Sequence, residues 1–216
     1  MKNPGMPKIA VITGRHGFHV PQFHHVFRSL SDADVYIQHM EMFSTSSKNI
    51  RESYDVVLFF HMFTETPSEE SDKRVKTTLE ELGETPQGLF LLHHSILAYP
   101  KWKLWSELVG MEDRKFDFYH DVSIHVEVAR ADHPITQGLR DWDMIDETYV
   151  MNDAGEDSEI LLTTEHLKSM KTIAWTRRYK KSRVFCFQSG HDNQTWMNHN
   201  FREVLRRGIQ WCASRI

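Results

Sequence analysis

Short, nearly unbroken apolar runs recur along the first half of the chain. They are "KIAVIT" (8–13), "DVVLFF" (55–60) and "GLFLL" (88–92). Runs of this length without polar alternation are typical of strands buried on both faces of a parallel sheet. The pattern therefore predicts three core strands with room for helices between them.

The segments between these runs have helical periodicity. Residues 21–30 place apolar side chains at i, i+3, i+4 and i+7, which predicts an amphipathic helix. Residues 66–83 begin with a capping box from Thr66 to Glu69 and end at Gly83, which predicts a second helix. Strands that alternate with helices favour an α/β fold with a doubly wound, mostly parallel sheet.

The second half of the chain has a different pattern. Apolar and polar residues alternate over 122–128 and 172–179, as in half-buried or antiparallel strands. Residues 182–188 form another core run, and an amphipathic helix is expected from about residue 200. The basic stretch 177–183 lies between two strand signals, so we interpret it as a solvated hairpin. With no repeat or linker, 1–216 is expected to form a single domain.

Composition narrows the function classes. The 216 residues include 26 Lys plus Arg and 30 Asp plus Glu, for a net charge of −4. This balance favours a small-molecule ligand and predicts no nucleic-acid or membrane partner, while a homo-oligomer stays open. Cys186 and Cys212 both lie in apolar segments. Two cysteines, no signal-peptide pattern and no membrane-length apolar run predict a cytoplasmic protein.

Histidine is the unusual component, with fourteen residues. Several of them directly follow predicted strands that are far apart in the sequence. These residues are His16 and His19 after the first run, His61 after the second, His93 and His94 after the third, and His191, followed by Asp192, after 182–188. Ligands of open α/β sheets bind at the carboxyl ends of the strands, so we expect these imidazoles to meet at one rim.

Four segments of the second half resemble a known family. They are "HPITQGL" (133–139), "DETY" (146–149), 173–196 and 201–211, and they occur in this order. Together they resemble the ThuA-like, or trehalose-utilisation, family, which "GLFLLHHS" and the glycine turn before His19 also fit. The resemblance covers nearly the whole chain. It implies one ThuA-like domain with the three-layer, flavodoxin-like sandwich of class I glutamine amidotransferases.

The chain departs from the amidotransferases at their nucleophile. Those enzymes carry a cysteine on the sharp turn after a core strand, and here the turn after 88–92 carries His93. Cys186 is expected within a strand and Cys212 on a helix face, so neither suits a nucleophile turn. Acyl-enzyme chemistry needs a thiolate, and we therefore expect that the chain is not a glutamine amidotransferase.

With no cysteine nucleophile, the reactive groups that remain are histidine and carboxylate side chains. Imidazole can bind zinc or act as a general acid or base near neutral pH. We expect His19, His93 and His191 to hold a divalent metal, zinc first, with His94 and His61 as substitutes, and expect no nucleotide cofactor. The expected catalytic residues are His93, His191, Glu147 and Asp192, the last orienting His191. The expected substrate-binding residues are Arg15, His16, His61, His94, Tyr149 and Trp196.

The resemblance implies an enzyme of carbohydrate catabolism that acts on trehalose or a related disaccharide, as a 3-keto glycoside. A keto group acidifies the neighbouring C–H bonds, so a histidine base with a metal would suit elimination or isomerisation. The sequence leaves lyase, hydrolase and isomerase open. It also leaves open a non-catalytic sugar- or metabolite-binding module and an amidotransferase-like subunit that works on a partner protein.

Overall fold

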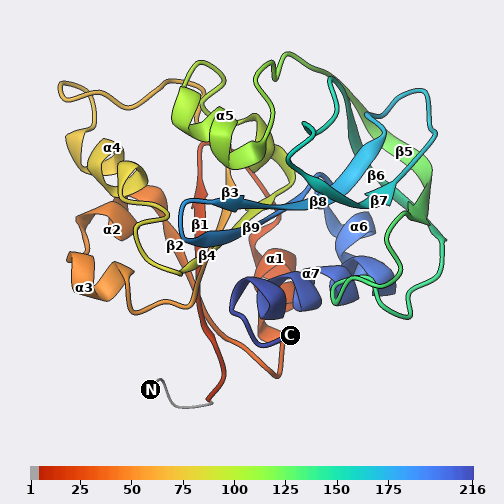
Figure 1. Ribbon diagram of the computed structural model, residues 1–216, viewed down its shortest axis with the longest axis horizontal. Coiled ribbons are helices and arrows are strands. Elements are labelled where there is room, and N and C mark those ends of the chain that lie inside the picture. Colours follow the sequence, from red (N-terminus) through yellow and green to blue (C-terminus); the bar gives the residue numbers. More distant parts are fainter. Residues whose placement is uncertain (1–4) are drawn as a thin grey trace.

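The computed structural model describes residues 5–216, which form a nine-stranded mixed sheet with helices on both faces (Figure 1). The strands are β1 (Lys8–Gly14), β2 (Asp34–His39), β3 (Val56–His61), β4 (Gly88–Leu92), β5 (Asp117–Val128), β6 (Trp142–Val150), β7 (Glu159–Thr163), β8 (Thr172–Tyr179) and β9 (Ser182–Phe187). The α-helices are α1 (Val20–Arg28), α2 (Met40–Thr45), α3 (Lys48–Arg51), α4 (Lys73–Glu80), α5 (Lys103–Val109), α6 (Asn193–Met197) and α7 (His199–Cys212), and a 3₁₀ helix, η1, spans His93–Leu97.

The sheet has two halves with different strand directions. Its order is β2-β1-β3-β4-β9-β8-β7-β5-β6. The four pairings from β2 to β9 are parallel, and the four from β9 to β6 are antiparallel. The prediction of a mostly parallel sheet is therefore wrong in the share of parallel pairings, which is half. The alternating segments of the second half join through antiparallel pairs, which leave some side chains facing solvent.

The parallel half is buried on both faces. Ile9 and Val11 of β1 belong to one apolar cluster, which also contains residues of α1 and α7. Ala10 and Ile12 belong to a second cluster, which contains residues of α2, α4 and α5. Successive strand residues point to opposite faces, so a strand covered on both sides needs apolar residues at every position. This explains the unbroken apolar runs.

The predicted hairpin is present, whereas the second predicted helix begins later than expected. Strands β8 and β9 pair as far as Tyr179 and Ser182, and the basic turn lies between them. Helix α4 begins after Asp72, whose carboxylate accepts a hydrogen bond from the Val75 amide at 3.3 Å. The Ser68 hydroxyl accepts hydrogen bonds from the amides of residues 70 and 71. This local turn competes with the helix expected from Thr66, so the helix starts at the next cap.

Strands β5 and β6 form a long antiparallel ribbon at the end of the sheet, separated from the parallel half by β7 and β8 (Figure 1). Their register shifts between Tyr119 and Val122, and Asp121 in the intervening bulge has a positive φ of 53°. A bulge re-aims the side chains around it. This ribbon carries residues 116–120 and 146–149 toward the carboxyl ends of the parallel strands. In the described part of the chain, no helix is long and apolar enough to cross a membrane.

Candidate functional site

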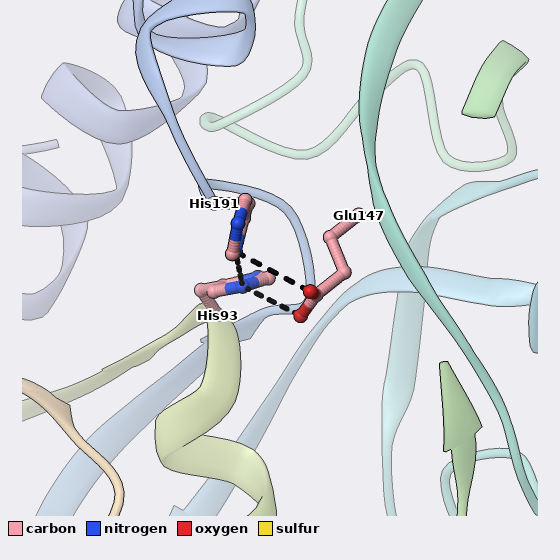
Figure 2. Close-up of side chains that lie close together, drawn as sticks. All are labelled: His93, Glu147 and His191. Carbon is pink, nitrogen blue, oxygen red and sulfur yellow. Dashed lines mark hydrogen bonds and ion pairs between the residues drawn. The ribbon is translucent and has the colours of Figure 1, made fainter. Parts of the chain in front are cut away.

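Three side chains from remote segments point toward one another at the carboxyl edge of the parallel strands (Figure 2). His93 follows β4, Glu147 lies in β6 and His191 follows β9. His93 Nε2 is 3.2 Å from His191 Nδ1 and 3.4 Å from Glu147 Oε1, and His191 Nδ1 is 3.5 Å from Glu147 Oε2. We call these three residues the His–Glu–His cluster.

His93 occupies a constrained position at the strand-to-helix turn. Its φ is +53°, and its side chain is fully buried. A left-handed backbone at a non-glycine residue costs on the order of 1 kcal/mol, and such strain is often found at functional sites. His93 Nδ1 lies 2.8 Å from the carbonyl oxygen of Gln188. A carbonyl can only accept, so Nδ1 is the donor and the neutral ring has its lone pair on Nε2.

Glu147 and Tyr149 of β6 complete the surroundings of that lone pair. The Tyr149 hydroxyl is 2.8 Å from His93 Nε2, and Glu147 Oε2 is 2.8 Å from His120 Nδ1. Burial alone would raise the pKa of Glu147, but the hydrogen bond and charge of His93, followed by the charge of His191, lower it to about 2. Burial raises the pKa of the Tyr149 hydroxyl, which stays a donor at neutral pH.

A buried carboxylate fixes the segment that carries His191. Asp146 accepts hydrogen bonds from the backbone amides of Gly190 at 2.9 Å and His191 at 3.0 Å, and from the Thr195 hydroxyl at 2.7 Å. Burial raises the pKa of Asp146, and these donors oppose that rise. Asp146 therefore holds the backbone of the turn, and the adjacent Glu147 enters the cluster.

The cluster borders a pocket of about 280 Å³. Its lining combines four histidines and a carboxylate with apolar and aromatic walls. The lining residues are His16, Met62, His94, Leu97, Phe116, Phe118, His120, Glu147, Tyr149 and His191. The rings of His16 and His94 stack with centroids 4.0 Å apart. His94 is buried beside the pocket, and neither of its ring nitrogens has a hydrogen-bond partner within residues 5–216.

The structure does not bring every predicted residue to this pocket. His19 is exposed at the N-cap of α1 and is not part of the His–Glu–His cluster, so the expected metal set with His93 and His191 is not assembled. Arg15 is exposed and lies over the Phe63 ring, outside the pocket lining.

His61 is the third predicted residue that lies outside the pocket. Its ring is fully buried among the rings of Phe59, Phe63, Tyr99 and Trp105. Burial in this apolar cage lowers the pKa of His61 to about 3. The last residue of β3 therefore faces the core.

Trp196 and Asp192 have local structural contacts. Trp196 is buried, packs against Phe23 and donates from its indole nitrogen to the Gly190 carbonyl at 2.8 Å. It supports the turn before His191 and does not line the pocket. The Asp192 carboxylate caps α6 by accepting from the Gln194 amide at 2.8 Å. Asp146 holds the His191 backbone amide, and the ring nitrogen Nδ1 faces His93 and Glu147.

Sequence reasoning missed several residues of the site. His120 lies in the β5 bulge, Phe116 and Phe118 form a wall, and Gln188 accepts from His93 through its backbone. Gln188 also donates its side-chain amide to the Glu147 carbonyl at 3.0 Å. No periodic signal marks these residues. A polar residue at the end of a core strand, as Gln188 is, was the available hint.

The buried cysteines do not provide a nucleophile. Cys186 lies in β9 and Cys212 in α7, and burial raises the pKa of both thiols. A thiol held protonated in the core is a poor nucleophile. His93 instead occupies the turn after the central strand β4.

The fold belongs to the glutamine amidotransferase-like class. A glutamine amidotransferase of Thermotoga maritima superposes with a TM-score of 0.58 at 11% identity, covering 95% of this chain and 98% of that chain. A protein of Parabacteroides merdae described as ThuA-like superposes with a TM-score of 0.74 at 19% identity, covering 96% and 90%. A ThuA-like protein of Bacteroides uniformis gives 0.74 at 17% identity, covering 98% and 93%. Identities this low show the fold alone.

The family model ThuA, described as trehalose utilisation, matches residues 8–212. The chain belongs to the ThuA family, and this membership supports a carbohydrate-related role. No curated protein sequence matches the chain.

Proposed function

We propose that the chain is an enzyme of carbohydrate catabolism that removes a proton next to the carbonyl of a 3-keto glycoside. The observation that carries this proposal is the His–Glu–His cluster with the Tyr149 hydroxyl, gathered at the wall of the pocket. Family membership supports the sugar as substrate. A Salmonella typhimurium protein of the same fold is described as cytoplasmic, which supports a cytoplasmic location.

The pocket contents favour proton abstraction over direct glycoside hydrolysis. Most glycosidases use two carboxyl groups on either side of the scissile bond. Within residues 5–216, Glu147 is the one carboxylate that lines the pocket, because the Asp146 carboxylate is buried against backbone amides. A keto group removes the need for a second carboxylate, since it makes the neighbouring C–H bond acidic enough for an imidazole base.

The residues then divide the work as follows. His191, which is partly exposed in the pocket wall, takes the proton from the carbon next to the keto group. The Tyr149 hydroxyl lies 2.8 Å from His93 Nε2 in the free protein, and on substrate binding it turns its one proton to the oxygen that becomes negative, as an oxyanion donor does. Collapse of the enolate then expels the glycosidic oxygen in an elimination, or returns the proton elsewhere in an isomerisation.

The pocket shape suits one sugar ring. Its volume of about 280 Å³ is near the lower end of small-molecule sites. Phe116 and Phe118 offer aromatic surface to the apolar face of a ring, and His16 and His94 offer nitrogen atoms to hydroxyl groups. The second ring of a disaccharide would extend outward past Phe118, which is exposed.

Deuterium exchange tests the proposal directly. The protein is incubated with a 3-keto glucoside in D₂O, and loss of the proton next to the carbonyl is followed by NMR. We expect enzyme-dependent exchange that Glu147→Gln and His191→Ala abolish and that the surface variant His19→Ala retains. Exchange at the rate of the buffer alone would reject the proposal.

A binding module is the second candidate. His93 stands where amidotransferases carry their nucleophile, and the aromatic pocket wall could hold a sugar without changing it. Saturable binding of trehalose with no exchange and no bond cleavage would establish this alternative.

A further inference from the structure

We propose that the His–Glu–His cluster is a metal site, in which His93 Nε2, His191 Nδ1 and the Glu147 carboxylate bind one zinc ion. This inference rests on the proposed function and changes one role in it. With Nδ1 on the ion, His191 keeps its ring proton on Nε2 and holds the metal, and the base is then His120, which lines the same pocket and has its Nδ1 2.8 Å from Glu147 Oε2. The ligand set differs from the set expected from the sequence, because Glu147 replaces His19. The ligands come from β6 and from the turns after β4 and β9 (Figure 2).

The spacing of the two ring nitrogens matches that of two ligands of a tetrahedral ion, and the Glu147 carboxylate lies beside both rings. The closest distances between the groups are 3.2, 3.4 and 3.5 Å, with one carboxylate oxygen facing each ring. Ligands about 2.0–2.1 Å from a tetrahedral zinc lie about 3.3 Å from one another.

The charges of the cluster also call for a cation between its members. The Gln188 carbonyl fixes the His93 proton on Nδ1, so the Nε2 lone pair points toward the Glu147 carboxylate at 3.4 Å. A lone pair and a carboxylate oxygen repel one another unless a proton or a metal ion lies between them. In the absence of an ion the Tyr149 hydroxyl, 2.8 Å away, can donate to His93 Nε2, but it leaves His191 Nδ1 and the carboxylate facing one another. One metal ion would accept lone pairs from all three groups.

The surroundings resemble those of known metal-binding histidines. Such histidines usually donate their second ring nitrogen to a carbonyl or carboxylate, which fixes the tautomer. His93 Nδ1 does so at 2.8 Å to Gln188, and Asp146 holds the His191 amide. His120 Nδ1 contacts Glu147 Oε2 at 2.8 Å and thereby fixes the carboxylate. These contacts position the ligands before an ion arrives.

The type of ligand selects the metal. Two imidazoles and one carboxylate form the protein part of many catalytic zinc sites, which keep a fourth position open. Calcium and magnesium prefer oxygen ligands alone. Glu147 and His191 line the pocket, so an open position would face the bound sugar and could polarise its carbonyl oxygen.

Metal titration tests the site without relying on activity. The full-length protein is stripped with a chelator and dialysed, and zinc is titrated by calorimetry, with metal content measured by mass spectrometry. Cobalt(II) replaces zinc in a second titration, because its visible absorption reports tetrahedral geometry. We expect one ion per chain, intense visible bands with cobalt, and a higher thermal midpoint with zinc.

Variants assign the ligands. We expect Glu147→Gln and His191→Ala to weaken zinc binding at least about 100-fold, because loss of a direct ligand exceeds the 10–100-fold typical of its hydrogen-bond partners. His19→Ala is the matched control and should bind zinc as the parent protein does. Tyr149→Phe removes a neighbouring hydroxyl but no ligand, and should retain one ion per chain.

The outcomes separate this inference from the proposed function. Absence of binding at millimolar zinc, or equal affinity in the parent protein and His191→Ala, would overturn the metal site. If zinc fails to bind in the titration while the chelated protein still exchanges the proton of a 3-keto glucoside at the full rate, the metal site is rejected and the proposed function stands. One tightly bound ion in a protein without sugar turnover supports the metal site and rejects the proposed function.

Discussion

His61 ends β3 and His93 directly follows β4, at the same edge of two neighbouring parallel strands, yet the two rings lie in opposite environments. The ring nitrogens of His93 contact four polar groups, whereas both ring nitrogens of His61 lack partners within residues 5–216. His61 is still part of β3, so the alternation of the strand points it into the apolar face. His93 lies one residue beyond β4, and its positive φ turns it away from that alternation.

The comparison shows that a histidine reaches the cleft at the carboxyl edge of the parallel strands when it lies in the turn after a strand. A histidine at the last strand position belongs to one face of the sheet. A histidine in the following turn can reach the cleft that the edge rule describes. His94 and His191, which lie past the ends of β4 and β9, line the pocket, and His61 does not.

The largest expected effect is on the rate of proton exchange, which should fall when a histidine of the cluster is replaced and stay unchanged when His61 is replaced. We expect His191→Ala and His93→Gln to lower proton exchange on a 3-keto glucoside by about 10²–10⁴-fold, the usual contribution of a positioned acid or base. His61→Phe should keep the parent rate, because its ring lies outside the pocket. NMR exchange rates of the purified proteins measure both. A comparable loss in His61→Phe would end the distinction drawn here.

The next largest effect should follow from removing the Asp146 carboxylate, which holds the turn before His191. Asp146→Ala leaves buried donors at Gly190, His191 and Thr195 without their acceptor, and we expect a loss of about 3 kcal/mol in the free energy of unfolding. Asp192→Ala removes a helix cap and should cost about 1 kcal/mol. Urea denaturation compares the two variants. Equal losses would mean that Asp146 does not hold the turn in the way inferred.

Lowering the pH should reduce the free energy of unfolding through His61, whose buried ring nitrogens have no hydrogen-bond partner within residues 5–216. Burial lowers the pKa of His61 to about 3 in the folded chain, against an ordinary value of 6.5. Between these values the unfolded chain binds more protons, so the stabilising effect is full above pH 6.5 and is lost as the pH falls toward 3. At pH 5 this amounts to about 2 kcal/mol relative to neutral pH.

His61→Phe keeps an aromatic ring and removes the titrating group. We expect its free energy of unfolding to fall less than that of the parent between pH 7 and pH 5, by about 2 kcal/mol. The exposed variant His19→Ala should follow the parent curve. Parallel curves for all three proteins would show that His61 is not the source of acid sensitivity.

The smallest expected effect is on substrate binding, when His16 in the glycine turn after β1 is replaced. His16 lines the pocket and stacks on His94, whereas His19 is exposed at the start of α1. His16→Ala removes one potential hydrogen bond to the sugar, so we expect KM to rise about tenfold with little change in kcat. His19→Ala should leave both constants unchanged. A fall in kcat alone would assign His16 to the chemical step instead of binding.

The sequence alone identified four of the five strands in the parallel half of this protein; the edge strand β2, which is only partly buried, was not expected. A strand covered on both faces must be apolar at every position, so 8–13, 55–60 and 88–92 could be recognised without a partner. The same reasoning located His93 and His191 beyond strand ends, and the missing thiol followed from the residue at the turn. These are properties of local chain segments, which the order of residues fixes.

Tertiary structure decided which polar residues meet. Pairing of β5 with β6, with its bulge, brings His120 and Glu147 within 2.8 Å, and no local pattern encodes that register. His61 is buried because it is the last residue of β3 and not the first residue of the following turn. His19 is exposed because it lies at the N-cap of α1. Contacts between remote segments depend on strand register and on turn geometry, because a shift of one residue reverses the face on which a side chain lies.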